Sequence, residues 1–155
     1  MREKLSVSRP WLIATVGMVL VIWGNSMMPG SDSSQMSSSV LDMARALLQA
    51  IGLPHGWLTS FLVRKAAHFT EYAALAVLAS KAFDPAARPG RVQALALAAF
   101  LVLVPALDET IQLFVPGRCG QPTDVLLDCC GALTGVVLRT AAARWLRRGA
   151  DPTDA

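Results

Sequence analysis

Charged residues are scarce in this chain, which argues against an ordinary soluble domain. Asp, Glu, Lys and Arg make up 16% of the 155 residues, whereas apolar residue types make up 54%. Soluble globular domains carry about 25% charged residues. The composition therefore predicts a membrane protein with a single domain over residues 1–155, and no second domain.

Three further sequence patterns are missing: cysteines spaced for disulfides or a metal, a nucleophile motif, and a signal-peptide cleavage site. The three cysteines, Cys119, Cys129 and Cys130, show neither a paired framework nor a metal-ligand spacing, so we interpret them as small packing residues. No G-x-S-x-G nucleophile motif is present. No A-x-A-like site follows the first apolar segment, so we expect that segment to be a retained signal anchor.

The chain contains several long apolar segments with few charged residues. Segments of about 18 residues or more are long enough to cross a bilayer as helices. Four qualify: residues 11–28, 57–83, 92–114 and 124–143. They predict an all-α polytopic membrane protein with about four transmembrane helices.

A short amphipathic helix is expected between the first two spans. Pro29-Gly30 and a serine-rich stretch over residues 31–39 suggest a loop, after which Ser39 can cap a helix that Gly52 and Pro54 end. At roughly 12 residues this helix is too short to span a bilayer. We expect it on the extracytoplasmic surface, either as a connector or as a lid.

The basic residues predict the orientation, because Lys and Arg accumulate in cytoplasmic loops. They flank the apolar segments rather than form a patch large enough for nucleic acid, which is not an expected partner. We expect a bacterial inner-membrane protein with both termini in the cytoplasm. The three groups that must share one side are Arg2, Lys4 and Arg9; Lys81, Arg88 and Arg91; and Arg139, Arg144, Arg147 and Arg148.

Ionisable side chains gather at the outer ends of the predicted spans, where burial makes them costly. Arg64, His68 and Glu71 are spaced four and three residues apart, on one helical face. The remaining members are Lys65 in the same span, Asp108, Glu109 and Gln112 in the third, Arg118 in the next turn, and Asp124 and Asp128 in the fourth. We expect one polar pocket open to the extracytoplasmic face.

Two alternatives remain open for these residues. They can form ion pairs that simply stabilise the bundle, for instance Arg64 with Asp108 or Arg118 with Asp124. They can also form a ligand site, since a bundle does not need so many ionisable groups at one end. Asp128 shares a helical stripe with Gly131 and Gly135, whose spacing predicts close approach of another helix.

Three sequence blocks, in this order, resemble the VanZ family. They are RKAAHFTEY at residues 64–72, DETIQLFVPGR at residues 108–118 and DVLLDCCG at residues 124–131, with Pro29-Gly30 after the first span. The resemblance covers nearly the whole chain. It implies a multi-span helical membrane protein, in a family whose founding member is linked to low-level resistance to teicoplanin, a lipidated glycopeptide.

The resemblance also implies which polar residues are characteristic of the family. These are Lys65, His68, Glu71, Asp108, Glu109, Gln112, Arg118, Asp124 and Asp128. The turn after Arg118 departs from the family pattern, because Cys119 and Gln121 stand where small hydroxyl residues are expected. A ligand bound by those hydroxyls is therefore not implied for this chain.

Two functions from different classes fit the sequence. A binding protein would hold a membrane lipid or a lipid-linked envelope precursor through Arg64, Lys65, Gln112 and Arg118, because arginine suits phosphate. An enzyme acting on a lipid phosphate or envelope precursor would use His68 as acid or base, oriented by Glu71. A divalent metal cofactor would then bind the carboxylates of Asp108, Glu109, Asp124 and Asp128. A transporter is disfavoured, because no inverted repeat is present.

Overall fold

The computed structural model describes residues 7–84, 86 and 90–149, and its regular structure there consists of five α-helices. The predicted all-α class is confirmed, and each predicted span corresponds to one helix. The helices are α1 (Arg9–Ser26), α2 (Gly30–Ala50), α3 (Ser60–Phe83), α4 (Arg91–Gln112) and α5 (Pro122–Gly149).

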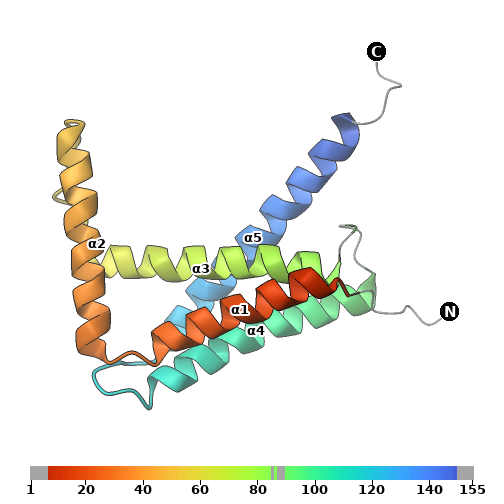
Figure 1. The fold of residues 1–155 in the computed structure, drawn as a ribbon, viewed down its shortest axis with the longest axis horizontal. Helices are drawn as coiled ribbons and strands as arrows, with labels where there is room; N and C mark the ends of the chain where they lie inside the picture. Colours follow the sequence, from red (N-terminus) through yellow and green to blue (C-terminus); the bar gives the residue numbers. More distant parts are fainter. Residues whose placement is uncertain (1–6, 85, 87–89, 150–155) are drawn as a thin grey trace.

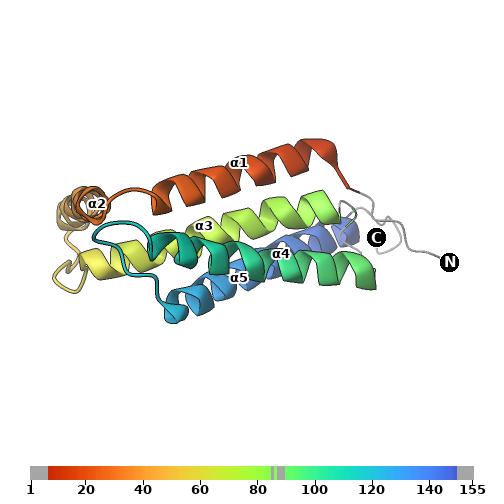
Figure 2. The ribbon, with the colours of Figure 1, turned by 90° about the horizontal axis from the view of Figure 1, so that it is seen from below.

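Four helices form a bundle, and the fifth lies across one end of it. Helices α1, α3 and α4 run alongside one another, α5 packs on α3 and crosses it obliquely, and α2 turns away from α1 by 107° (Figures 1 and 2). The start of α1, the end of α3, the start of α4 and the end of α5 share the end opposite α2. We call this the basic end, because Arg9, Lys81, Arg91, Arg144 and Arg147 lie in those helix termini. Arg2, Lys4 and Arg88 are outside the described residues.

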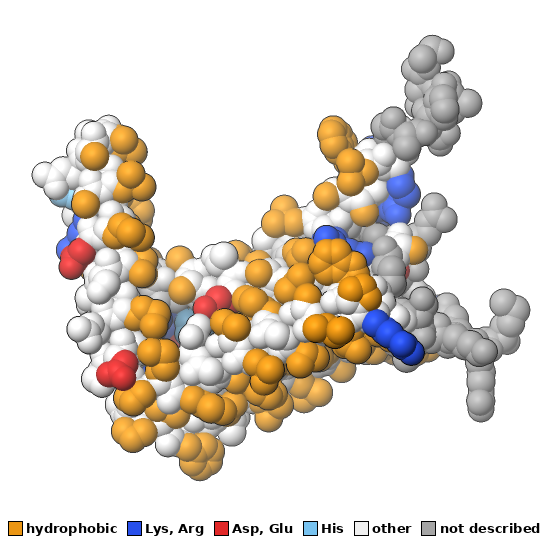
Figure 3. All heavy atoms as spheres, in the orientation of Figure 1, with side chains coloured by type: hydrophobic (Ala, Val, Ile, Leu, Met, Phe, Trp, Pro, Cys, Tyr) orange, Lys and Arg blue, Asp and Glu red, His pale blue; other side chains and the backbone are white. Residues whose placement is uncertain are grey.

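The surface of the bundle is apolar and its interior is partly polar, as in a membrane protein. Large apolar side chains such as Ile13, Leu95 and Leu133 are more than 60% exposed, whereas Asp108 and Asp128 are fully buried. Figure 3 shows hydrophobic side chains over much of the bundle face. Exposed apolar surface of this extent indicates contact with lipid.

Helices α4 and α5 are each long and apolar enough to cross a membrane, and the bent pair α1–α2 adds a third candidate if it is one span. Helix α3 carries four charged side chains, Arg64, Lys65, Glu71 and Lys81, and is not among the candidate spans of the described residues. The count of four spans stays a prediction.

The expectation of a short helix after Ser39 was wrong. Helix α2 begins at Gly30 and includes the serine-rich stretch. The hydroxyls of Ser37, Ser38 and Ser39 donate to carbonyl oxygens four residues earlier, at 2.9, 3.0 and 3.1 Å, so they are satisfied within the helix rather than at a cap. The end is as predicted, because Gly52 has a φ of 72° and terminates the helix.

Glycines set the closest helix contact, between α3 and α5. A Cβ atom at Gly131 would lie 2.4 Å from the carbonyl oxygen of Phe69, and one at Gly135 would lie 2.1 Å from that of Ala73. Ala76 on α3 and Ala132 on α5 are also small and buried. The close approach predicted from the glycine spacing is confirmed.

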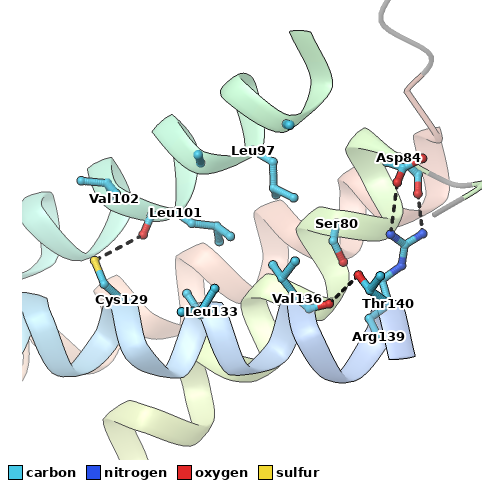
Figure 4. Close-up of a pocket in the computed structure, with 13 residues that line it drawn as sticks. Ser80, Asp84, Leu97, Leu101, Val102, Cys129, Leu133, Val136, Arg139 and Thr140 are labelled. Carbon is cyan, nitrogen blue, oxygen red and sulfur yellow. Dashed lines mark hydrogen bonds and ion pairs between the residues drawn. The ribbon is translucent and has the colours of Figure 1, made fainter. Parts of the chain in front are cut away.

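Proline inside α4 frees one backbone carbonyl, and α5 supplies a donor for it. Pro105 has no N–H, so the carbonyl of Leu101 loses its helical partner. The Cys129 thiol lies 4.0 Å from that oxygen (Figure 4). In an apolar environment even a weak donor there is favourable, because no water is available. Cys129 is thus a packing residue, as predicted.

Helix α2 is held in place by the loop between α4 and α5. The Gly30 amide donates to the Pro116 carbonyl at 3.0 Å, and Gly117 beside it has a φ of 72°. A Cβ atom at Gly30 would lie 1.9 Å from the Gly117 carbonyl oxygen. The contact needs glycine at both positions, for close approach at one and for the left-handed backbone at the other.

Candidate functional site

Four ionisable side chains from three helices converge near the α2 end of the bundle. They are His68 on α3, Asp108 and Glu109 on α4, and Asp128 on α5, and we call them the His68 cluster. Each offers one ligand atom, and these atoms all lie within 4.8 Å of one another. Asp108 and Asp128 are 0% exposed and Glu109 is 5% exposed. The three carboxylates are therefore enclosed by protein.

Within the cluster, His68 faces Asp128. Their nearest atoms, Nδ1 of His68 and Oδ1 of Asp128, are 3.5 Å apart, which is an ion-pair distance longer than a good hydrogen bond. Glu71, which the sequence suggested as the orienting carboxylate, instead accepts a hydrogen bond from Asn25 at 3.2 Å. The carboxylate positioned to orient His68 is on a different helix.

Gln112 is the main donor to the cluster from within α4. Its buried Nε2 lies 3.0 Å from Oε1 of Glu109, 3.3 Å from Oδ2 of Asp108 and 3.4 Å from Oγ of Ser26. The amide of Gln121 donates to Oε2 of Glu109 at 2.8 Å. These donors fix the two α4 carboxylates, so Gln112 supports the cluster instead of facing the groove described next.

A groove of about 690 Å³ lies between α2 and α3, and we call it the α2 groove. In Figure 3, acidic and histidine side chains lie in the angle between α2 and the bundle. The polar residues that line the α2 groove include Arg64, His68, Glu71 and Arg118. The apolar residues that line it include Met36, Val40, Trp57 and Leu62. The groove thus combines cations with an apolar wall, and His68 belongs both to it and to the cluster.

The two arginines have no carboxylate partner in the described part of the chain. Arg64 is exposed, and Arg118 donates a hydrogen bond to the Ser33 hydroxyl of α2. Burial lowers the pKa of Arg118 from its usual value, and the nearby charge of Arg64 lowers that pKa further. The charges of Asp108 and Glu109 oppose this shift, and since arginine stays protonated in proteins, a positive charge that is not in an ion pair lies beside the groove.

The remaining two predicted site residues pair with each other. Lys65 forms an ion pair with Asp124, and both side chains are partly exposed. Asp124 is therefore outside the His68 cluster, contrary to the four-carboxylate set expected from the sequence. The example pairs Arg64–Asp108 and Arg118–Asp124 are not formed in the described structure. The polar set divides into a buried cluster, a groove and one ion pair.

A second crevice, of about 320 Å³, lies between α4 and α5 (Figure 4). Leu97, Leu101 and Leu133 line it, and an ion pair between Arg139 and Asp84 closes it toward the basic end. Its apolar lining leaves little for polar chemistry. We therefore place the candidate site at the α2 end.

Sequence reasoning missed Asn25, Ser26 and Ser33 as site residues. Asn25 and Ser26 are in the last turn of α1, at the same end as the other polar groups, and Ser26 is buried. Polar residues in the final turn of an apolar span were a usable signal. Ser33 had none, because its contact with Arg118 depends on the angle between α1 and α2.

The comparison with known families agrees with the geometry. The VanZ/LLP1 family model matches residues 11–143, which include every helix segment that contributes to the cluster and the groove. No curated protein and no solved structure matches the chain. The match covers most of the chain, so this protein belongs to the VanZ/LLP1 family.

Proposed function

We propose that this protein binds the phosphate-bearing headgroup of a membrane lipid, or of a lipid-linked envelope precursor, in the α2 groove. The observation that carries the proposal is the pair Arg64 and Arg118, which lines one groove without a carboxylate partner in the described residues. Guanidinium groups bind phosphate by paired hydrogen bonds. The two arginines would therefore bind the anionic headgroup of the ligand.

The apolar part of the groove accounts for the lipid. Met36 and Val40 from α2 face Leu62 and Val63 from α3 across the same space as the arginines. A ligand that fills such a groove has both an anionic group and a hydrocarbon part. The link of the family's founding member to low-level resistance against teicoplanin, a lipidated glycopeptide, supports an envelope ligand of this kind.

Removal of either groove arginine is expected to weaken binding of anionic lipid. Each substitution, Arg64→Gln or Arg118→Gln, removes a charged hydrogen-bond donor, so we expect about tenfold weaker retention of phosphatidic acid or phosphatidylglycerol. Native mass spectrometry in detergent, with a zwitterionic lipid for comparison, measures this.

The matched control is Arg144→Gln, which makes the same change of charge on an exposed residue at the basic end. It is expected to retain lipid as the wild type does. Equal loss of lipid from all three variants would mean that net charge, and not the groove, determines binding, and the proposal would fail.

We also propose that the protein lies in the bacterial inner membrane with the basic end in the cytoplasm and α2 outside. Support comes from the basic residues at one end of the bundle, since such residues favour the cytoplasmic side.

The native thiol of Cys119 tests this orientation. Cys119 is free and exposed in the loop at the α2 end. A membrane-impermeant maleimide added to intact spheroplasts is expected to label the wild type, and the Cys119→Ser variant is expected to lose that label. Labelling only after the membrane is permeabilised would place Cys119 in the cytoplasm and contradict the proposed orientation.

A second candidate function, an enzyme acting on a lipid phosphate, is favoured by one observation. His68 lines the groove and lies 3.5 Å from Asp128, so an imidazole that can transfer protons borders the ligand space. Release of phosphate or of a headgroup from bound lipid, abolished in His68→Gln, would establish the enzyme.

A further inference from the structure

We infer that the His68 cluster is a binding site for a divalent first-row transition-metal ion. The cluster brings one imidazole and three carboxylates from three helices to within 4.8 Å, the separation of atoms that share one ion. The lipid proposal does not enter the argument, because the metal site is formed by protein side chains alone.

Buried polar atoms without hydrogen bonds indicate a cation-binding site. Neither carboxylate oxygen of Asp128 has a hydrogen bond, although the residue is fully buried. Oδ1 of Asp108 and Nδ1 of His68 also lack hydrogen bonds, and the nearest charged atom to Nδ1 is Oδ1 of Asp128, at the ion-pair distance of 3.5 Å. Buried polar atoms are nearly always satisfied, and buried charges are paired or coordinate metals.

No lysine or arginine of the described chain forms an ion pair with the three carboxylates, although Arg118 interacts with Asp108 and Glu109 at longer range. Lys65 is paired with Asp124, Arg139 is paired with Asp84, and the two groove arginines form no ion pair with the cluster. Three acidic groups so close together in a protein interior repel one another. A doubly charged ion between them removes both the repulsion and the unsatisfied atoms.

The surrounding hydrogen bonds resemble those that orient metal ligands. Gln112 donates to one oxygen of Asp108, which leaves the other oxygen free to face the cluster centre. Glu109 is held by Gln112 and by the Gln121 amide. Partners of this kind fix the ligand carboxylates before the ion binds.

The ligand types select the class of ion. Imidazole favours zinc, iron and related ions over magnesium and calcium, whereas carboxylates suit manganese as well. No thiol joins the cluster, and Cys129, which follows Asp128 in the chain, faces the Leu101 carbonyl. We therefore assign the site to Mn²⁺, Fe²⁺ or Zn²⁺.

Metal analysis of the purified protein tests the assignment. The protein is prepared with a tag free of histidine, incubated with each ion in turn, desalted and analysed by inductively coupled plasma mass spectrometry. We expect a roughly equimolar amount of one of the three ions in the wild type. The affinity is expected to fall at least tenfold in Asp128→Asn and His68→Gln, and about 10- to 100-fold in Gln112→Leu.

Asp124→Asn and Glu71→Gln are the matched controls, because both remove a nearby carboxylate charge outside the cluster. They are expected to keep the metal. Thermal unfolding with and without each ion is a second measurement, which separates loss of metal binding from poor folding of a variant. The bound ion should raise the Tm of the wild type and of both controls, but not of Asp128→Asn. Absence of metal from the wild type together with an unchanged Tm for every ion would overturn the assignment, as would equal metal loss from Asp124→Asn and Asp128→Asn.

Discussion

Substitution of Gly135 by leucine is expected to lower the free energy of unfolding by about 3 kcal/mol, the upper range for overpacking of a tight interface. The cause is steric, because even a Cβ atom at this position would lie 2.1 Å from the Ala73 carbonyl oxygen. Helix backbone cannot move aside as a flexible side chain can, so α3 and α5 must separate. Unfolding by SDS in mixed micelles measures the change.

Gly17→Leu on α1 is the matched control for this substitution. Gly17 is exposed, and a Cβ atom there has nothing within 4 Å. Leucine also has a higher helix propensity than glycine, by roughly 1 kcal/mol. The control is therefore expected to be neutral or stabilising. If both variants unfold at the same SDS fraction, close α3–α5 contact does not determine stability.

Gln112→Leu is expected to have a similarly large effect on stability, a loss of about 3 kcal/mol in buffer that contains a chelator. The substitution keeps the approximate volume but removes the donor that reaches both Asp108 and Glu109. Both carboxylates are buried, so water cannot replace it. The same SDS titration measures the loss.

Gln49→Leu, at an exposed position of α2, makes the same chemical change where water remains available. Surface substitutions of this kind stay within about 0.5 kcal/mol. The interpretation of Gln112 as the donor that holds the cluster carboxylates would be abandoned if its substitution were as mild as that of Gln49.

The sequence predicted the helices of the bundle because their cause is local. Residues 11–28, 57–83, 92–114 and 124–143 are apolar over lengths that favour spanning helices, and α1, α3, α4 and α5 lie there. Helix α2 was predicted too short. A serine-rich segment reads as a loop when hydroxyls are expected to cap, and only the structure shows them bonded to the preceding turn.

The sequence also predicted that polar groups gather at one end, but not how they divide. Helical spacing suggested that Glu71 would orient His68, and that Asp124 would join the other carboxylates. In the structure Asp128 faces His68, and Asp124 pairs with Lys65. Spacing along one helix gives the face of a residue, whereas contacts between helices depend on their rotation and crossing angle.

The sequence by itself determined that this is an all-α membrane protein of the VanZ kind, with a set of acidic and basic residues gathered at the end of the bundle opposite its basic end. Those properties follow from composition, apolar length and short motifs, which act through local physics. Tertiary structure decided that His68, Asp108, Glu109 and Asp128 share one buried volume, and that Arg64 and Arg118 line a separate groove. The reason is physical: two glycines bring α3 and α5 into backbone contact, and the Gly30–Gly117 contact holds α2 across the end of the bundle.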